Sequence, residues 1–516
     1  MIGADKVVKP WKETMRAWFH PRVVTMLFLG FSAGIPILLI FSTLSAWLRE
    51  AGVERAAVTF FSWAALGYSF KFVWAPLIDR MPLPLLTRLL GRRRGWMVVS
   101  QAAIIAAIFW MASIDPSQSQ AHLTAMAFAA ILLGFSSATQ DIVIDAFRIE
   151  CVEEEMQAML SATYIAGYRI GMLVAGAGSL ALAGYLGTTV ELYQYRAWQL
   201  TYYGVGGCML VGILTTLVTS EPERSDVPQK LVYSTIDYLR FFVLFLCLVF
   251  TFALVFFYGG AVTGSIKEVF KESSPLSVRV IGFLLESGRL FFSLVCALLM
   301  ARGLVLLGLV DRQMVDDTYI DPVKDFFKRY GLRTALLLLL LVGFYRVSDI
   351  VLGVISTVFY LDIGFSKMEI AAIVKTFGLL MTIVGGFLGG MLTVRFGILR
   401  ILFAGAVLSA ATNVLFMLLA GSGPDPFLLK VVIGADNLAA GLASAAFVAF
   451  LSSLTSISFT AVQYAVFSSI MSLFPKLIGG YSGTIVTSIG YPSFFLFTAL
   501  MGIPVIYLIW LVRKVK

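Results

Sequence analysis

Charged side chains are scarce in this sequence. Asp, Glu, Lys and Arg make up 13% of its 516 residues, whereas roughly 25% is typical of soluble domains. Hydrophobic residues make up 59%, and the mean hydropathy is +0.90. A soluble fold of this length cannot hide so much apolar surface. The composition therefore predicts a polytopic membrane protein whose main surroundings are the lipid bilayer.

Histidine and cysteine are also rare. The sequence has two histidines and four cysteines, and the cysteines show no paired spacing. It therefore lacks the material for a zinc site or for histidine-dependent catalysis, and no phosphate-binding loop indicates ATP-driven transport. The net charge of +9 does not indicate nucleic-acid binding, because the basic residues lie in short loops between apolar runs. We expect no enzymatic activity, no metal and no bound cofactor.

Apolar runs fill most of the chain. With about 20 residues per crossing, they predict an all-α protein with fourteen transmembrane helices. The predicted spans are 23–47, 57–77, 96–113, 122–147, 158–187, 198–219, 239–263, 278–310, 334–361, 368–392, 400–420, 427–454, 459–479 and 490–512.

The distribution of Lys and Arg predicts the orientation. These residues concentrate in the segments on the same side as the N-terminus, so the positive-inside rule places both termini, including residues 513–516, in the cytoplasm. Residues 1–22 are charged and aromatic. This pattern predicts an amphipathic helix along the cytoplasmic interface and no cleavable signal peptide.

Two polar stretches, 220–230 and 311–333, divide the chain. They enclose two spans, and the remaining spans form two groups of six. Six plus six is the pattern of the major facilitator fold, in which two six-helix bundles enclose a mid-membrane substrate site. The expected units are bundles at 23–220 and 334–512, separated by linkers and a two-helix insert at 221–333.

The segment after the second span resembles a loop that major facilitator transporters have at this position. An Asp–Arg pair is followed by a linker and an arginine cluster; the residues are Asp79, Arg80, Arg92, Arg93 and Arg94. An aspartate at a helix end can pair with arginines or with the positive end of a neighbouring helix. We expect this loop to latch the two bundles on the cytoplasmic side. The alternative is a positive loop that only orients the chain.

Several charged residues lie inside apolar spans, where each costs roughly 2.5–3.5 kcal/mol. They are Lys71, Asp141, Asp145, Arg169, Arg346, Asp349, Lys375 and Asp436. Such residues face the bundle interior or a wet cavity, so they outline a central cavity. Further candidates for contacts with a sugar or peptide are Asn437, Gln463, Tyr68 and Tyr168. For each tyrosine, ordinary packing is the alternative. Gln140 is a third polar group, directly before Asp141.

Asp141 and Asp145 lie one turn apart on one helical face. Arg148 follows Asp145 by three residues, so we expect Asp145 to form a latch with Arg148 and the arginine cluster at 92–94. Asp141 lies one turn deeper and has no arginine partner in its own helix, which favours a role in substrate binding or proton exchange. Arg346 and Asp349 are three apart and are expected to neutralise each other.

Gly34 and Pro36 lie inside the first span. Proline removes a backbone donor and glycine weakens a helix. We therefore predict a helix break at these residues, beside the cavity.

The sequence resembles the AmpG-type muropeptide permeases, a bacterial family within the major facilitator superfamily. The matching segments are GFSAGIPI (30–37), FKFVWAPLIDR (70–80), GRRRGW (91–96), SATQDIVIDA (137–146), GYRIGMLVAG (167–176), KTFGLLMTIVGGFLGG (375–390), AAFVAFL (445–451) and FTAVQYA (459–465). The resemblance covers both halves but not the insert. It implies import of N-acetylglucosaminyl-1,6-anhydro-muramyl peptides across the bacterial inner membrane, driven by the proton gradient. It also implies that Gln140 and Asp141 are the family's polar pair. We expect a monomer.

Two alternatives remain open at this point. The first keeps the fold but changes the cargo to acetyl-coenzyme A, a drug or a siderophore. The nearly balanced charges of the predicted cavity suit a zwitterionic peptide on neutral sugars better than a polyanion. The second is a membrane-embedded transferase, which would need an acidic or histidine cluster at an interface. The carboxylates here lie too deep and too scattered for that.

Overall fold

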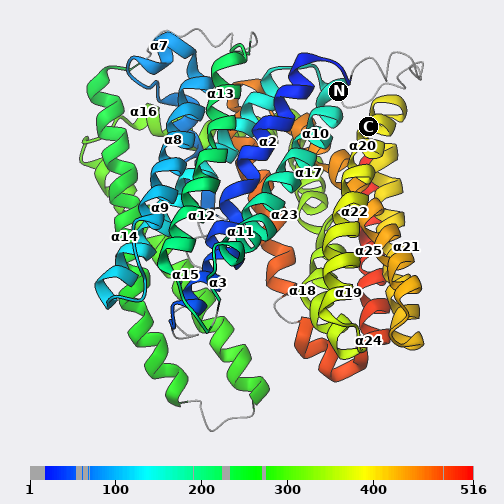
Figure 1. Cartoon of the computed structure of the whole chain (residues 1–516). Coiled ribbons are helices and arrows are strands. Elements are labelled where there is room, and N and C mark those ends of the chain that lie inside the picture. The colour runs from blue at the N-terminus through cyan, green and yellow to red at the C-terminus, as the bar shows by residue number, and fades with distance from the viewer. Residues whose placement is uncertain are drawn as a thin grey trace. The chain divides into compact units, whose positions relative to one another are not determined.

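The computed structural model describes residues 18–53, 61, 68, 70–189, 191–222, 233–269, 275–479 and 482–514. Every regular element among these residues is helical (Figure 1). Twelve helical segments are long and apolar enough to cross a membrane, and a shorter apolar stretch covers Ile457–Leu473. The predicted all-α class and approximate helix number are confirmed. The predicted helix at 1–22, up to residue 17, and most of the predicted span at 57–77 lie outside the described residues.

Residues up to Asp226 and from Phe326 form one compact unit, and Val227–Asp325 form a second. The first unit thus covers the ranges of both predicted bundles, and we call its two parts the first half (residues 18–222) and the second half (residues 326–514). The second unit holds the two-helix insert, and its boundaries lie within the predicted range of 221–333.

The first half comprises α2 (Pro21–Ile40), α3 (Ser42–Glu50), η2 (Lys71–Val73), α6 (Ala75–Arg80), α7 (Leu86–Leu90), α8 (Arg92–Ala112), α9 (Gln120–Glu150), η3 (Glu154–Met156), α10 (Gln157–Leu173), η4 (Val174–Gly178), α11 (Ser179–Tyr185), α12 (Tyr195–Cys208) and α13 (Leu210–Val218). The insert comprises α14 (Thr235–Val269), α15 (Pro275–Leu306), α16 (Arg312–Val315) and η5 (Asp316–Ile320).

The second half begins within α17 (Asp321–Phe344). It continues with α18 (Val347–Asp362), α19 (Lys367–Glu369), η6 (Ile370–Phe377), α20 (Gly378–Phe396), α21 (Ile398–Ser422), α22 (Pro426–Leu454), η7 (Ile457–Phe459), α23 (Thr460–Gly479), α24 (Ser482–Leu500) and α25 (Gly502–Lys514). Among the η elements, η4, η5 and η6 are π-helical and the others are 3₁₀ turns.

Local capping signals start the long helices. In α22, the Asp425 carboxylate accepts a hydrogen bond of 2.8 Å from the backbone N–H of Phe427, and Pro426 occupies the first helical position. In α9, the Ser119 hydroxyl caps the first turn in the same way. These residues satisfy N–H groups that a helix start leaves without an intrahelical partner, so the sequence itself specifies where these helices begin.

Glycine pairs allow α2 and α10 to pack backbone against backbone (Figure 1). A Cβ atom added to Gly30 would lie 2.2 Å from the carbonyl oxygen of Tyr164, and one added to Gly167 would lie 1.9 Å from that of Leu27. Gly34 approaches α10 equally closely one turn further along α2. Small residues four apart are what close helix packing in a membrane requires.

The helix break predicted at Gly34 and Pro36 is misplaced. The helix α2 runs through both residues to Ile40, and the interruption lies at Phe41, where φ and ψ are both −96°. Proline removes one backbone donor, yet the packing of α2 against α10 keeps the helix continuous through Pro36. Gly34 serves helix packing instead of a break.

Substituting Gly34 by Ala is expected to destabilise the protein by about 1–3 kcal/mol, the usual cost of overpacking. The added methyl group would lie 2.0 Å from the carbonyl oxygen of Tyr168, a backbone atom that cannot move aside alone. The matched control is Gly207→Ala in α12, where the methyl group meets no atom within 4 Å. Because Ala favours helix over Gly by about 1 kcal/mol, the control should be neutral or stabilising. Thermal unfolding of the two purified variants in detergent measures the difference, and equal melting temperatures would contradict the packing role.

Candidate substrate and gating site

Several charged residues of the spans lie on helices through which the two halves meet. The helix α10 of the first half packs against α20 and α22 of the second, and α23 of the second half packs against α6 and α9 of the first. Side chains on these helices therefore connect elements that are far apart in sequence.

Arg93 neutralises two buried carboxylates at one end of this interface. Its Nη2 atom lies 2.7 Å from Oδ1 of Asp79 and 2.5 Å from Oε1 of Glu150, and its Nε atom lies 3.0 Å from Oε2 of Glu150. Arg93 is 0% exposed, Asp79 5% and Glu150 1%. Charge-assisted, partly bidentate bonds of this kind are the strong ones in proteins. We call Asp79, Arg93 and Glu150 the charge triad.

The charge triad also contacts the start of α23 in the second half. Oδ2 of Asp79 accepts a 3.0 Å hydrogen bond from the backbone N–H of Val462. The Thr460 hydroxyl donates to Oε1 of Glu150 at 2.8 Å. The first N–H groups of a helix lack intrahelical partners and carry its positive dipole end, so both carboxylates stabilise this helix terminus. The charge triad thereby joins the two halves at what we call the arginine end.

The other arginines of the loop surround the charge triad. Arg92 lies 3.6 Å from Glu150, and Arg94 donates to two carbonyl groups near the end of α13. Arg80 lies over the ring of Phe459, with its guanidinium carbon 5.5 Å from the ring centroid. Each arginine of the predicted latch thus has a partner at the arginine end.

Glu221 caps the helix that carries Arg93. Its carboxylate accepts hydrogen bonds from the backbone N–H groups of Arg93 and Arg94, at 2.8 and 3.1 Å. Burial raises the pKa of the Glu221 carboxyl, and these two hydrogen bonds oppose the increase. Gly91 has a positive φ of 91°, and a Cβ there would lie 2.4 Å from the Glu221 side chain. The cap therefore depends on glycine at this position.

The expected pairing of Asp145 with the 92–94 cluster does not occur among the described residues. Asp145 pairs with Arg148 at 3.2 Å, as the spacing predicts, and with Lys71 at 3.7 Å. The arginine cluster contacts Glu150, which was not among the predicted site residues. Glu150 can reach the cluster because it lies five residues nearer the end of α9. At 1.5 Å per residue this is about 7.5 Å. The sequence does contain a signal for this contact, because Glu150 is a carboxylate at the last position of the helix and a basic loop lies at the same end.

Arg148 connects the first half to the second. Its Nη1 atom donates to the Ser161 hydroxyl on α10 and to the Ser452 hydroxyl on α22, both at 2.9 Å. Its guanidinium carbon lies 5.1 Å from the ring centroid of Tyr464 on α23. The cation–π contact with Tyr464 and the hydrogen bond to Ser452 cross between the halves, so the position of Arg148 depends on how the halves meet.

Asp141 lies one turn deeper in a different environment. It is half-buried and accepts a hydrogen bond of 3.4 Å from the Tyr164 hydroxyl. Within the described ranges, no Lys or Arg nitrogen approaches its carboxylate within 4 Å, whereas Asp145 has two cations. A carboxyl group with no cation within 4 Å and a tyrosine hydroxyl as its hydrogen-bond partner is suited to take up a proton.

The second half holds its own charged cluster. Arg346 pairs with Asp349 at 3.5 Å, as the spacing predicts, and also donates to the Ser444 hydroxyl on α22. Asp436 accepts a hydrogen bond from the Thr412 hydroxyl at 3.2 Å. All three charged residues of this cluster are half-buried, so part of each side chain stays exposed.

Two further cations are partly or fully exposed. Arg169 on α10 is half-exposed, and Lys375 is exposed within the π-helical segment η6. A π-helical turn inserts an extra residue into a helix and is frequent at functional sites.

Three predicted polar contacts belong to packing within one half. Gln140 is fully buried and donates to the Ser32 hydroxyl of α2 at 2.8 Å. Asn437 accepts a hydrogen bond of 2.8 Å from a threonine of α20, and Gln463 accepts one of 2.8 Å from an arginine of α17. At these three positions the side chain hydrogen-bonds to a neighbouring helix of its own half. Tyr68 donates to the Ser137 hydroxyl at 2.6 Å.

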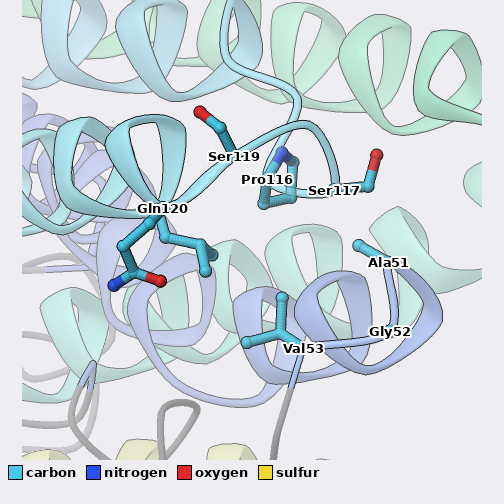
Figure 2. Close-up of a pocket in the computed structure, with 8 residues that line it drawn as sticks. Ala51, Gly52, Val53, Pro116, Ser117, Ser119 and Gln120 are labelled. Atoms are coloured by element: carbon cyan, nitrogen blue, oxygen red, sulfur yellow. The ribbon is translucent and has the colours of Figure 1, made fainter.

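A surface pocket of about 370 Å³ lies away from these residues (Figure 2). It is formed by the turn at Gly52 and the loop at Pro116, which joins α8 to α9. Because α8 begins at the arginine end, this loop lies at the opposite end of the first half. None of the predicted site residues lines the pocket. Among the described residues, no group of His, Cys, Asp and Glu side chains is arranged to hold a metal ion.

Comparison with known proteins gives sequence relatives along nearly the whole chain. A family model described as acetyl-coenzyme A transporter 1 matches residues 22–219. The putative transporter AmpG 4 of Rickettsia conorii is 31% identical over 488 residues, which cover 95% of each chain. The anhydromuropeptide permease of Escherichia coli is 27% identical over 504 residues, covering 97% of this chain and 82% of the relative.

Solved structures show the same fold. The major facilitator proton:xylose symporter XylE matches with a TM-score of 0.58 and 10% identity, over 97% of this chain and 96% of its own. The fucose:proton symporter FucP of Escherichia coli matches with a TM-score of 0.58 and 12% identity, over 95% and 98%. The fold is therefore that of the major facilitator superfamily.

Proposed function

The chain belongs to the AmpG family of membrane transporters within the major facilitator superfamily, and from this premise we propose that it imports anhydro-muropeptides. The cargo is an N-acetylglucosaminyl-1,6-anhydro-N-acetylmuramyl peptide released in cell-wall turnover. The observation that carries this proposal is the similarity to the anhydromuropeptide permease along almost the entire chain. The protein acts as a monomer in the bacterial inner membrane.

Transport is coupled to protons through Asp141. This carboxyl group lies near the interface of the halves, and in the described part of the chain only a neutral tyrosine hydroxyl hydrogen-bonds to it. Protonation removes a charge that would oppose movement through a low-dielectric region. The proton gradient is the energy source, and no cofactor takes part.

Alternating access follows from the contacts at the arginine end. We place this end in the cytoplasm, together with both termini, because the basic residues concentrate there. The charge triad and Arg148 then close the cytoplasmic side, so the cargo enters from the periplasm. Import requires these contacts to separate while contacts at the opposite end form.

Acetyl-coenzyme A is the second candidate cargo, favoured by the family model that matches residues 22–219. Its phosphates would require several uncommitted cations. In the structure, Lys71 contacts Asp145 and Arg346 contacts Asp349. The remaining cations, Arg169 and Lys375, suit a singly charged peptide terminus better than a polyphosphate.

The proposal is tested by uptake of radiolabelled anhydro-muropeptide into right-side-out membrane vesicles. We expect accumulation with an imposed proton gradient and none after an uncoupler is added. Inside-out vesicles with the opposite gradient test the direction of transport. Excess acetyl-coenzyme A should not compete. Equal uptake with and without the proton gradient would contradict proton coupling. Competition by acetyl-coenzyme A would favour the second cargo.

A further inference from the structure

The first part of α17 is packed against α23 within the second half. The helix kinks at Gly331, whose φ of 70° lies in the left-handed region that favours glycine, so residues 326–330 end a helical segment of their own. Phe326 is 4% exposed, and its ring centroid lies 5.2 Å from that of Phe467 on α23. Arg329 follows Phe326 by nearly one helical turn and reaches the connection between α22 and α23.

Arg329 bonds to both ends of that connection. Its Nη1 atom donates to the carbonyl oxygen of Leu454, the last residue of α22, at 3.1 Å. Its Nη2 atom donates to Oε1 of Gln463, in the first turn of α23, at 2.8 Å. The same oxygen accepts a 2.7 Å hydrogen bond from the backbone N–H of Ser456. A cation suits the carbonyl groups that a helix end leaves without partners, so Arg329 holds the end of α22 beside the start of α23.

The start of α23 is also where the first half binds the second. The charge triad accepts hydrogen bonds from the Thr460 hydroxyl and from the backbone N–H of Val462. Gln463 is the next residue, so the group that Arg329 holds and the donors that the charge triad binds belong to one helical turn. Hydrogen bonds weaken steeply when their angles fall below about 120°. The contact between the halves therefore depends on the orientation of this turn.

We propose that Arg329 positions the start of α23 so that the charge triad can latch the two halves together. This inference rests on the proposed alternating access but not on the identity of the cargo. Arg329 acts through α23 and is a positioning residue. Because it orders the turn before the halves meet, less conformational freedom is lost when the latch closes, and the closed arrangement is favoured.

The residue next to Arg329 offers a matched control. Arg329 and Lys328 are both exposed and both carry a positive charge. Lys328 forms no hydrogen bond or ion pair with the part of the chain that the structure describes. Replacing either residue by Gln removes one charge at nearly the same place, but only Arg329→Gln breaks the bonds to α22 and α23.

Electron-spin distance measurements on the full chain in lipid nanodiscs test the role. The labels replace Arg88 on α7 and Arg513 on α25, which are both exposed, in a protein whose four native cysteines are replaced. Neither label lies on the connection between α22 and α23, so a local movement of this connection leaves their distance unchanged. We expect Arg329→Gln to raise the ratio of the open, longer distance to the closed one about 10-fold, since hydrogen bonds from a charged group are lost.

Further variants separate bonding from charge. Lys328→Gln should keep the wild-type ratio, and Arg329→Lys, which keeps a charged donor, should shift it less than Arg329→Gln does. Gln463→Met removes the same contact from the other side and should shift the ratio in the same direction. Thr460→Val removes one hydrogen bond to the charge triad. Combined with Arg329→Gln, it should give less than the product of the two separate shifts, because both changes act on the same turn.

The outcomes separate the positioning role from the proposed alternating access. If Arg93→Gln lengthens the distance and Arg329→Gln does not, the latch stands and the positioning role is wrong. Equal shifts in Arg329→Gln and Lys328→Gln would reduce the effect to charge alone, and shifts that multiply fully with Thr460→Val would show that Arg329 acts elsewhere. If neither Arg93→Gln nor Arg329→Gln changes the distance, alternating access through the arginine end is wrong and the positioning role with it.

Discussion

Replacing Asp141 by Asn abolishes gradient-driven accumulation of anhydro-muropeptide. The amide keeps the shape and the hydrogen bond to Tyr164 but cannot bind and release a proton. One charge crossing a potential of ~100 mV gains about 2.3 kcal/mol, which sustains an accumulation ratio of roughly 50-fold. The variant should fall to a ratio of about one, the value of an uncoupled carrier.

The measurement is uptake into vesicles with an imposed proton gradient, together with exchange of internal for external substrate without a gradient. Exchange should survive in Asp141→Asn, because substrate still binds and the halves still move. The matched comparison is Asp145→Asn, which removes a partner of Lys71 and Arg148 one turn away. That variant should alter the rate but still respond to the gradient. Normal accumulation by Asp141→Asn would exclude this carboxyl group as the proton site and make Asp436 the next candidate.

Replacing Arg93 by Gln opens the arginine end. The change leaves the buried carboxylates of Asp79 and Glu150 without their shared cation. Removing one partner of a buried ion pair costs about 3–5 kcal/mol. Because every 1.4 kcal/mol is a factor of ten, this cost shifts a two-state equilibrium by roughly 100-fold or more. The arrangement that separates the two halves at the arginine end relieves the cost by admitting water to the carboxylates.

Electron-spin distance measurements detect this opening. Labels at Arg88 and Ser458 lie on exposed positions of the two halves at the arginine end, in a protein whose four native cysteines are replaced. The label-to-label distance should lengthen in Arg93→Gln and change less in Arg93→Lys, which keeps the charge. The charge triad would not be a latch if Arg93→Gln, at normal membrane levels, gave the same distance distribution as wild type.

Sequence alone determined the features that depend on local pattern. Long apolar runs specify membrane helices because every backbone group in lipid must be satisfied within its own segment. Caps such as Asp425 with Pro426 specify where a helix begins. The pairing of Arg346 with Asp349 follows from helical spacing, which places residues three apart on one face. The family could likewise be identified from contiguous segments such as SATQDIVIDA.

Tertiary structure decided which distant groups meet. From the sequence, we expected Asp145 to pair with the arginine cluster. Glu150 lies nearer the end of α9 and pairs with Arg93 of that cluster, whereas Asp145 pairs with Lys71. Gly34 permits close packing because α10, far along the chain, lies against it. Spacing within a helix fixes neighbours one turn apart, whereas contacts between helices depend on their crossing and depth, which no local pattern encodes.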